Sequence, residues 1–235
     1  HYADSYNGLS VFCPAKRGGT RMSYYIENIF LCLAVPLILS LLFRKGRQRT
    51  FTVFVILGMG SCLFSAYVSS FFAGSYGADT AVAVMEITPV CEEVVKFLPL
   101  LFYLLVFEPD KHEIVSPAIG IAVGFATFEN VCYLTENGAA DFSYVLIRGV
   151  SAGSLHLLCG IALGCGIAYV FRKKWIMVTG TIGALGACVV FHGIYNILIT
   201  ANSRWNLIGY LFPIFLIFAL LAVKKFRLYR KIEFE

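Results

Sequence analysis

The sequence of 235 residues has little charge: 14% of it is Asp, Glu, Lys or Arg, against about 25% in ordinary soluble proteins. Hydrophobic residues make up 59% of the chain, and the mean hydropathy is +0.78. No polar stretch is long enough to form a soluble domain of useful size. These features exclude a typical soluble protein and predict a polytopic protein embedded in a lipid bilayer.

Several familiar site patterns are also missing. The aspartates fall only in tails or loops, which excludes a membrane-embedded aspartate dyad: Asp4, Asp79, Asp110 and Asp141. No H-E-x-x-H sequence occurs, so a metal site with two histidines on one helical turn is excluded. Residues 149–153 match G-x-S-x-G, but that nucleophile elbow needs a strand-turn-helix context and this match lies in an apolar run.

The cysteines and the basic residues both fit a membrane protein. None of the eight cysteines forms a C-x-x-C pair, and most lie in apolar runs, so we expect small buried hydrophobic side chains rather than disulfides or ligands. The net charge of +5 comes from Lys and Arg in short loops. This pattern is typical of cytoplasmic loops and predicts no nucleic-acid partner.

Seven apolar runs are long enough to cross a bilayer as helices, which takes about 20 residues each. We therefore predict an all-α, polytopic membrane helix bundle of about seven transmembrane helices. The domain assignment is a polar tail at residues 1–23 and one transmembrane domain at residues 24–235 with a basic C-terminal end. The expected spans are residues 24–43, 51–72, 81–107, 115–134, 142–171, 176–201 and 206–223.

Seven spans place the loops after the first, third and fifth spans on the same side as the C-terminus. That side carries the basic residues of 44–49, 172–174 and 224–231. Because cytoplasmic loops are enriched in Lys and Arg, we expect a multi-pass protein of the cell membrane with a cytoplasmic C-terminus and an outer N-terminus.

The third apolar run contains three charged residues close together near its middle, Glu92, Glu93 and Lys96, besides Glu86 nearer its start. Charge at that depth costs roughly 2.5 to 3.5 kcal/mol per residue, and intramembrane ionisable residues usually face a bundle interior and have a function. Lys96 lies three and four residues after the glutamates, so all three share neighbouring helix positions. One lysine leaves one carboxylate in surplus, and we interpret that carboxylate as the functional signal.

Four more polar residues occur in apolar runs: Glu129, His156, His192 and Asn196. They belong to three further spans at depths that allow them to meet Glu92 and Glu93 in one layer. Carboxylates and imidazoles together are suited to activating water, with a carboxylate as base and the others as metal ligands or hydrogen-bond donors. The alternative is a transporter or channel that moves protons or cations through the same residues. We expect Glu86 and Arg148 to be structural.

These residues resemble the motifs of a known family, the PrsW intramembrane proteases. Glu92-Glu93-Val94-Val95-Lys96 looks like the family's E-E-x-x-K motif, and residues 124–130, His156 and residues 192–196 are similar to its later motifs, in the same order. The family is distantly related to CaaX prenyl proteases and bacteriocin-processing membrane proteases. The resemblance implies an intramembrane endopeptidase of the bacterial plasma membrane that cuts a single-span membrane protein, of the anti-sigma-factor type, on the extracytoplasmic side.

The resemblance and the residues together suggest roles. We expect Glu92 or Glu93 to activate water, Lys96 to keep one of them ionised, and Asn196 to support the oxyanion or His192. Glu129, His156 and His192 would bind zinc, since the family is called metalloprotease and a catalytic zinc takes three protein ligands. A metal-free glutamate mechanism, with His192 and Asn196 as oxyanion donors, fits the same residues.

Overall fold

The computed structural model describes residues 26–137, 142–170, 174–201 and 204–233, and the predicted tail at residues 1–23 lies outside them. Within these ranges the chain is helical, without strands. The elements are α1 (Ile26–Ser40), α2 (Gly46–Tyr76), α3 (Thr80–Val82), the π-helical turn η2 (Ala83–Ile87), α4 (Thr88–Phe107), the 3₁₀ turn η3 (Lys111–Glu113), α5 (Val115–Asn137), α6 (Phe142–Val170), α7 (Lys174–Thr200) and α8 (Arg204–Glu233).

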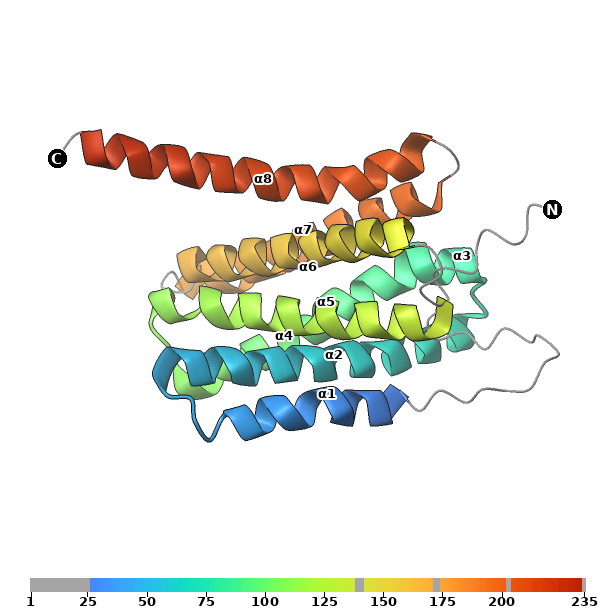
Figure 1. Cartoon of the computed structure of the whole chain (residues 1–235), viewed down its shortest axis with the longest axis horizontal. Coiled ribbons are helices and arrows are strands. Elements are labelled where there is room, and N and C mark those ends of the chain that lie inside the picture. The colour runs from blue at the N-terminus through green and yellow to red at the C-terminus, as the bar shows by residue number, and fades with distance from the viewer. Residues whose placement is uncertain (1–25, 138–141, 171–173, 202–203, 234–235) are drawn as a thin grey trace.

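The long helices lie roughly alongside one another and alternate in direction, as Figure 1 shows. The α1–α2 link and the C-terminal end of α8 lie at one end of the bundle, and the α2–α3 corner lies at the other. The prediction of an all-α membrane helix bundle is confirmed. We call the end with the α1–α2 link the basic end, because that link and the start of α2 carry Arg44, Lys45, Arg47 and Arg49.

Five segments are long and apolar enough to cross a membrane by length and composition: Gly46–Tyr76, Lys111–Thr135, Phe142–Val170, Trp175–Thr200 and Arg204–Lys224. Two expected spans differ from these. The first ends at Ser40, because hydrogen bonds of the 3₁₀ type close the chain into a turn there, and α1 has only 15 residues. The other is α4. It has 20 residues, but it is not among the five segments, because it carries the three charged side chains of the sequence motif.

The third predicted span, residues 81–107, is helical throughout, but a π-helical turn interrupts its regular α-helical winding. Gly77 ends α2 with a left-handed φ of 61°, and the Asp79 side chain accepts a hydrogen bond from the Val82 amide to cap α3. The π-helical turn η2 then leads into α4, which has Pro89 in its first turn. Proline has no amide proton to donate to the preceding turn, so a wider turn there is expected.

The closest helix packing joins α2 to α5 through two glycines. A Cβ atom at Gly58 would overlap the Ile121 carbonyl, and one at Gly124 would overlap the Val55 carbonyl. The two backbones are therefore in direct contact, as small residues permit in membrane bundles. This contact fixes α5, which also packs against α4 and α6, in the middle of the bundle.

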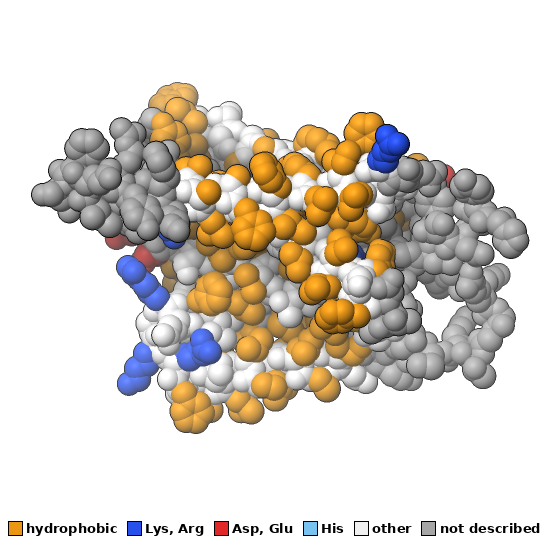
Figure 2. Space-filling model, turned by 45° about the horizontal axis from the view of Figure 1, so that its top comes forward, with side chains coloured by type: hydrophobic (Ala, Val, Ile, Leu, Met, Phe, Trp, Pro, Cys, Tyr) orange, Lys and Arg blue, Asp and Glu red, His pale blue; other side chains and the backbone are white. Residues whose placement is uncertain are grey.

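The outer surface of the bundle is apolar. In Figure 2, hydrophobic side chains cover the middle of the molecule, and Lys and Arg lie mainly towards the left end, which is the basic end. Large exposed hydrophobic residues occur on several helices, for example Phe71, Phe102, Leu105 and Phe215. Such a surface suits lipid chains in the middle and water or headgroups at both ends.

Candidate active site

Helix α4 directs its charged residues into the bundle, where two of them form an ion pair. Lys96 Nζ donates to Glu93 Oε1 at 2.6 Å, and the two residues are only 5% and 2% exposed. Lys96 thus donates to Glu93 rather than to the neighbouring Glu92. The surplus carboxylate inferred from the sequence is therefore Glu92.

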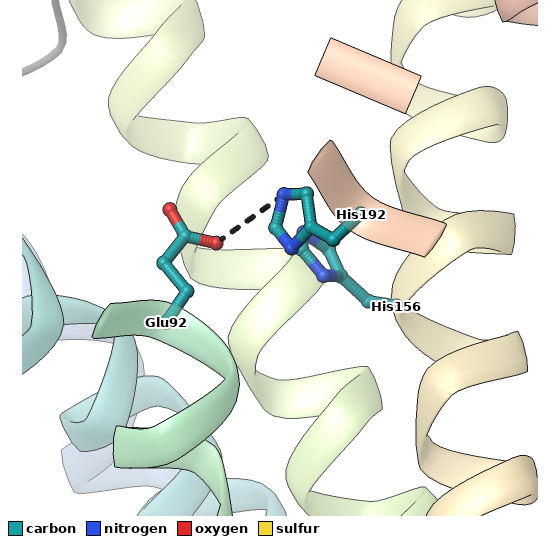
Figure 3. A group of neighbouring side chains, drawn as sticks. All are labelled: Glu92, His156 and His192. Carbon is teal, nitrogen blue, oxygen red and sulfur yellow. Dashed lines mark ion pairs between the residues drawn. The ribbon is translucent and has the colours of Figure 1, made fainter. Parts of the chain in front are cut away.

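His192 from α7 lies between the two glutamates. Its Nδ1 is 2.8 Å from Glu93 Oε1, and its Nε2 is 3.8 Å from Glu92 Oε2. Because a carboxylate paired with a lysine only accepts, Nδ1 carries a ring proton, and in the neutral ring Nε2 then offers its lone pair. Figure 3 shows this nitrogen side of the ring directed at Glu92.

The space between Glu92 and His192 is polar and unfilled by protein. Glu92 Oε2 is buried without a hydrogen-bond partner among the described residues. Two acceptors 3.8 Å apart do not bond to each other, but a water molecule or a cation between them would satisfy both. A water molecule in this position would contact both a carboxylate and an imidazole, the pair of groups suited to general acid–base chemistry.

His156 from α6 is held on both ring nitrogens. Its Nδ1 is 2.9 Å from Lys96 Nζ, and its Nε2 is 2.6 Å from Glu129 Oε2. Lysine can only donate, so Nδ1 accepts and Nε2 donates to Glu129. The ring is 1% exposed and packs against the His192 ring, with centroids 5.2 Å apart.

Glu129 on α5 is paired on its other oxygen with Arg148. Arg148 Nη2 lies 3.0 Å from Glu129 Oε1, and Nη1 donates to Asn130 at 2.8 Å. The guanidinium also lies 3.7 Å from the centre of the Tyr133 ring. Arg148 is only 7% exposed, and its positive charge balances the negative charge of the partly buried Glu129 carboxylate. Sequence reasoning classed this arginine as structural and did not connect it to Glu129.

Asn196 lies one helical turn after His192 and contacts the π-helical turn. Its Nδ2 donates to the Val84 carbonyl at 3.0 Å. The bond joins α7 to η2 and satisfies a carbonyl that the irregular turn leaves available. The expected role of Asn196 as an oxyanion donor stays a prediction, since its amide group serves this backbone contact here.

A cavity of about 490 Å³ adjoins the Glu92–His192 gap. On the side formed by α2, the cavity is lined by a row of small side chains that includes Ser65, Ser69 and Ala73. The cavity extends to Gly77 and Thr80 at the α2–α3 corner. Volumes of 300 to 1,000 Å³ are typical of small-molecule sites. The cavity therefore has room for a short peptide segment beside the polar residues.

The donor set beside the cavity fits a divalent metal ion. Ligand atoms of Glu92, His156 and His192 lie within 4.8 Å of one another. The structure thus groups Glu92 with the histidines, whereas Glu129, the carboxylate expected from the sequence, lies behind His156. Glu93 and Glu129 each bond a ring nitrogen of a histidine, as carboxylates behind metal-bound histidines commonly do. Coordination through His156 Nδ1 would require Lys96 to move.

Comparison with known proteins identifies the group to which this site belongs. Residues 47–223 match the model of the PrsW family intramembrane metalloprotease. The chain belongs to the PrsW family. It is 31% identical to Protease PrsW of Bacillus subtilis over 104 residues (42% of this chain, 43% of that protein) and 30% identical to Protease PrsW of Oceanobacillus iheyensis over 142 residues (57% and 62%).

Protease PrsW of Geobacillus kaustophilus is 29% identical over 136 residues, which is 54% of each chain. The chain thus matches between 43% and 62% of the length of these PrsW proteins. No solved structure matches. The family resemblance seen in the sequence is confirmed, and the chain is a multi-pass membrane protein with bacterial relatives.

Proposed function

We propose that this PrsW protein is an intramembrane endopeptidase in which Glu92 and His192 activate one water molecule. The observation that carries the proposal is the unpartnered Glu92 Oε2, which lies 3.8 Å from His192 Nε2 in the lining of a cavity. The water would be bonded to both groups, and Glu92 would take its proton as the peptide carbonyl is attacked.

The surrounding residues would keep the two reacting groups in place. Lys96 balances the charge of Glu93, and Glu93 fixes the tautomer and direction of His192. On the other side, Arg148 holds Glu129, which accepts from His156. A fixed arrangement of this kind lowers the cost of reorganisation during the reaction.

Glu92, His156 and His192 are the residues that would hold a zinc ion, in place of the expected set with Glu129. When bound, the ion would act as a Lewis acid that polarises the water and the peptide carbonyl. Glu92 has two carboxylate oxygens, so it could contribute a ligand and still accept a proton. With or without zinc, the hydrogen bond to Glu93 would hold His192 in the same orientation.

We further propose that the substrate is a single-span membrane protein cut on the extracytoplasmic side. The cavity extends towards the α2–α3 corner, which lies opposite the basic end in Figure 1. If the basic end is cytoplasmic, as the distribution of Lys and Arg favours, a substrate segment enters from the outer side. A proton or cation carrier built on the same residues is the competing hypothesis, and family membership favours the protease.

The test is a comparison of new protein N-termini in membranes of cells that produce the wild type or Glu92→Gln. Glu86→Gln is the matched control, because Glu86 is an exposed carboxylate six residues earlier. We expect a set of N-termini within or just outside the outer half of single-span proteins, present with the wild type and with Glu86→Gln only. Identical N-termini in all three strains would refute the protease assignment.

A further inference from the structure

Two cysteines lie one helical turn from the two histidines, towards the basic end. Cys159 follows His156 by three residues on α6, and Cys188 precedes His192 by four residues on α7. Residues spaced in this way share a helix face, so both thiols point into the layer between α6 and α7. The residues are 3% and 2% exposed, and neither contributes to the wall of the substrate cavity.

The two thiols approach each other across this layer. Cys188 Sγ lies 3.5 Å from the Cys159 carbonyl oxygen, and Cys159 Sγ lies 3.9 Å from the Cys188 carbonyl oxygen. Both sulfur atoms and a carboxylate oxygen of Glu93 lie within 4.8 Å of one another. Three helices, α4, α6 and α7, thus bring two sulfur donors and one oxygen donor to one buried point.

We propose that Glu93, Cys159 and Cys188 form a second metal site that takes a thiophilic cation such as Cd²⁺ or Zn²⁺. Thiolate sulfur is the donor that selects such ions, and zinc accepts a carboxylate oxygen alongside it. Zn–S bonds of about 2.3 Å need the donors to close in by only a small movement from their present separations. The two thiol protons pass to the buffer as the sulfur atoms coordinate.

Charge balance favours occupancy of this site by a divalent ion. Two thiolates and the Glu93 carboxylate carry three negative charges, while Lys96 at 2.6 Å from Glu93 carries one positive charge. A divalent cation makes the buried cluster neutral, and neutrality removes most of the cost of placing charge in an apolar interior.

Occupancy of this site would also affect catalysis, because Glu93 is shared. The same carboxylate bonds His192 Nδ1, so a cation that draws Glu93 towards the thiols loosens the hold on His192. We therefore expect inhibition when the second site fills. This consequence rests on the proposed protease function, whereas metal binding by the two cysteines does not.

The test is a titration of the purified full-length protein in detergent with CdCl₂, monitored by the ultraviolet charge-transfer band of cadmium thiolates. The background carries Cys62→Ala and Cys132→Ala, which removes the two thiols in the cavity wall. We expect one saturable equivalent per chain, lost in Cys159→Ala and in Cys188→Ala. Cys165→Ala, which removes an exposed thiol, should leave the band unchanged.

A band that persists in Cys159→Ala and Cys188→Ala would overturn the proposal, as would no saturable band in the parent protein. Glu93→Gln with Lys96→Met keeps the thiols and removes the carboxylate together with its paired charge, and we expect at least tenfold weaker cadmium binding. Unchanged cadmium affinity in that variant would show that Glu93 is not a ligand of the second metal site. Binding without inhibition of substrate cleavage would overturn only the link to catalysis.

Discussion

Lys96 Nζ lies 2.6 Å from Glu93 Oε1, and both side chains are almost completely buried. Glu93→Gln would leave the ammonium group buried without its counter-charge, which typically costs about 3 to 5 kcal/mol. We therefore expect Glu93→Gln to lower the thermal unfolding temperature in detergent as well as the activity. The measurement is thermal unfolding of the purified variant beside the wild type.

The double variant Glu93→Gln with Lys96→Met separates charge from structure. It removes both charges of the pair, and replacing a buried pair by uncharged groups is often neutral for stability. We expect stability to return and activity to stay low, because His192 loses its orienting carboxylate. A stable single Glu93→Gln variant would show that the ion pair is not what holds Lys96 in the bundle.

Asn196→Ala tests the contact between α7 and the π-helical turn. The substitution leaves the buried Val84 carbonyl without its 3.0 Å donor, at a cost of about 1 to 3 kcal/mol. Asn206→Ala is the matched control, since the Asn206 amide also donates to a backbone carbonyl, that of Ile199, away from the cavity. If Asn196 acts only structurally, Asn196→Ala and Asn206→Ala will cleave substrate at equal rates once each rate is divided by the amount of folded protein.

A drop in cleavage rate of tenfold or more, confined to the folded Asn196→Ala protein, would instead assign Asn196 a direct part in the reaction. That outcome would restore the oxyanion role expected from the sequence. It would also require the Val84 contact to break during catalysis.

Gly58→Ala tests the contact of α2 with α5. The added methyl group meets the Ile121 backbone, which cannot move as a side chain can, and overpacking typically costs about 1 to 3 kcal/mol. Gly183→Ala is the control, because a Cβ atom there meets nothing within 4 Å. Unfolding temperatures should fall for the first variant and stay unchanged for the second. Equal temperatures would contradict the close α2–α5 packing.

The two ligand sets differ in the carboxylate that binds a metal ion. If Glu92, His156 and His192 hold zinc, Glu92→Gln and His156→Ala will lose it while folded Glu129→Gln retains it. The measurement is the zinc content of purified monodisperse protein, with exhaustive chelation and zinc return as the activity control. Zinc loss in Glu129→Gln alone would restore the ligand set expected from the sequence, and full activity after chelation would favour the metal-free mechanism.

Much of the fold could be predicted because lipid imposes simple rules on sequence. Apolar runs of sufficient length predict the long helices of the bundle. The α2–α5 contact through Gly58 and Gly124 was missed, because single glycines on two distant segments carry no local pattern. The irregular winding of the third span has a visible signal in Pro89, but the sequence does not show that it takes the form of a π-helical turn before that residue.

The candidate site residues stand out in the sequence because polar groups are costly in an apolar span. Their pairing could not be found in the same way. Lys96 is within one helical turn of both glutamates in the sequence, and only the structure shows that it pairs with Glu93 and leaves Glu92 Oε2 without a hydrogen-bond partner in the described part of the chain. Arg148 could have been linked to Glu129 by its similar distance from the α5–α6 connection, since the two helices are antiparallel neighbours.

The central claim is that Glu92 activates the water. The most direct measurement is the cleavage rate of a single-span substrate, identified from the N-terminal comparison, in liposomes containing wild type, Glu92→Gln or Glu86→Gln. Loss of a general base typically costs 10²- to 10⁴-fold, so we predict a fall of about that size for Glu92→Gln with an unchanged unfolding temperature, and none for Glu86→Gln. A Glu92→Gln protein that cleaves at the wild-type rate would contradict the account.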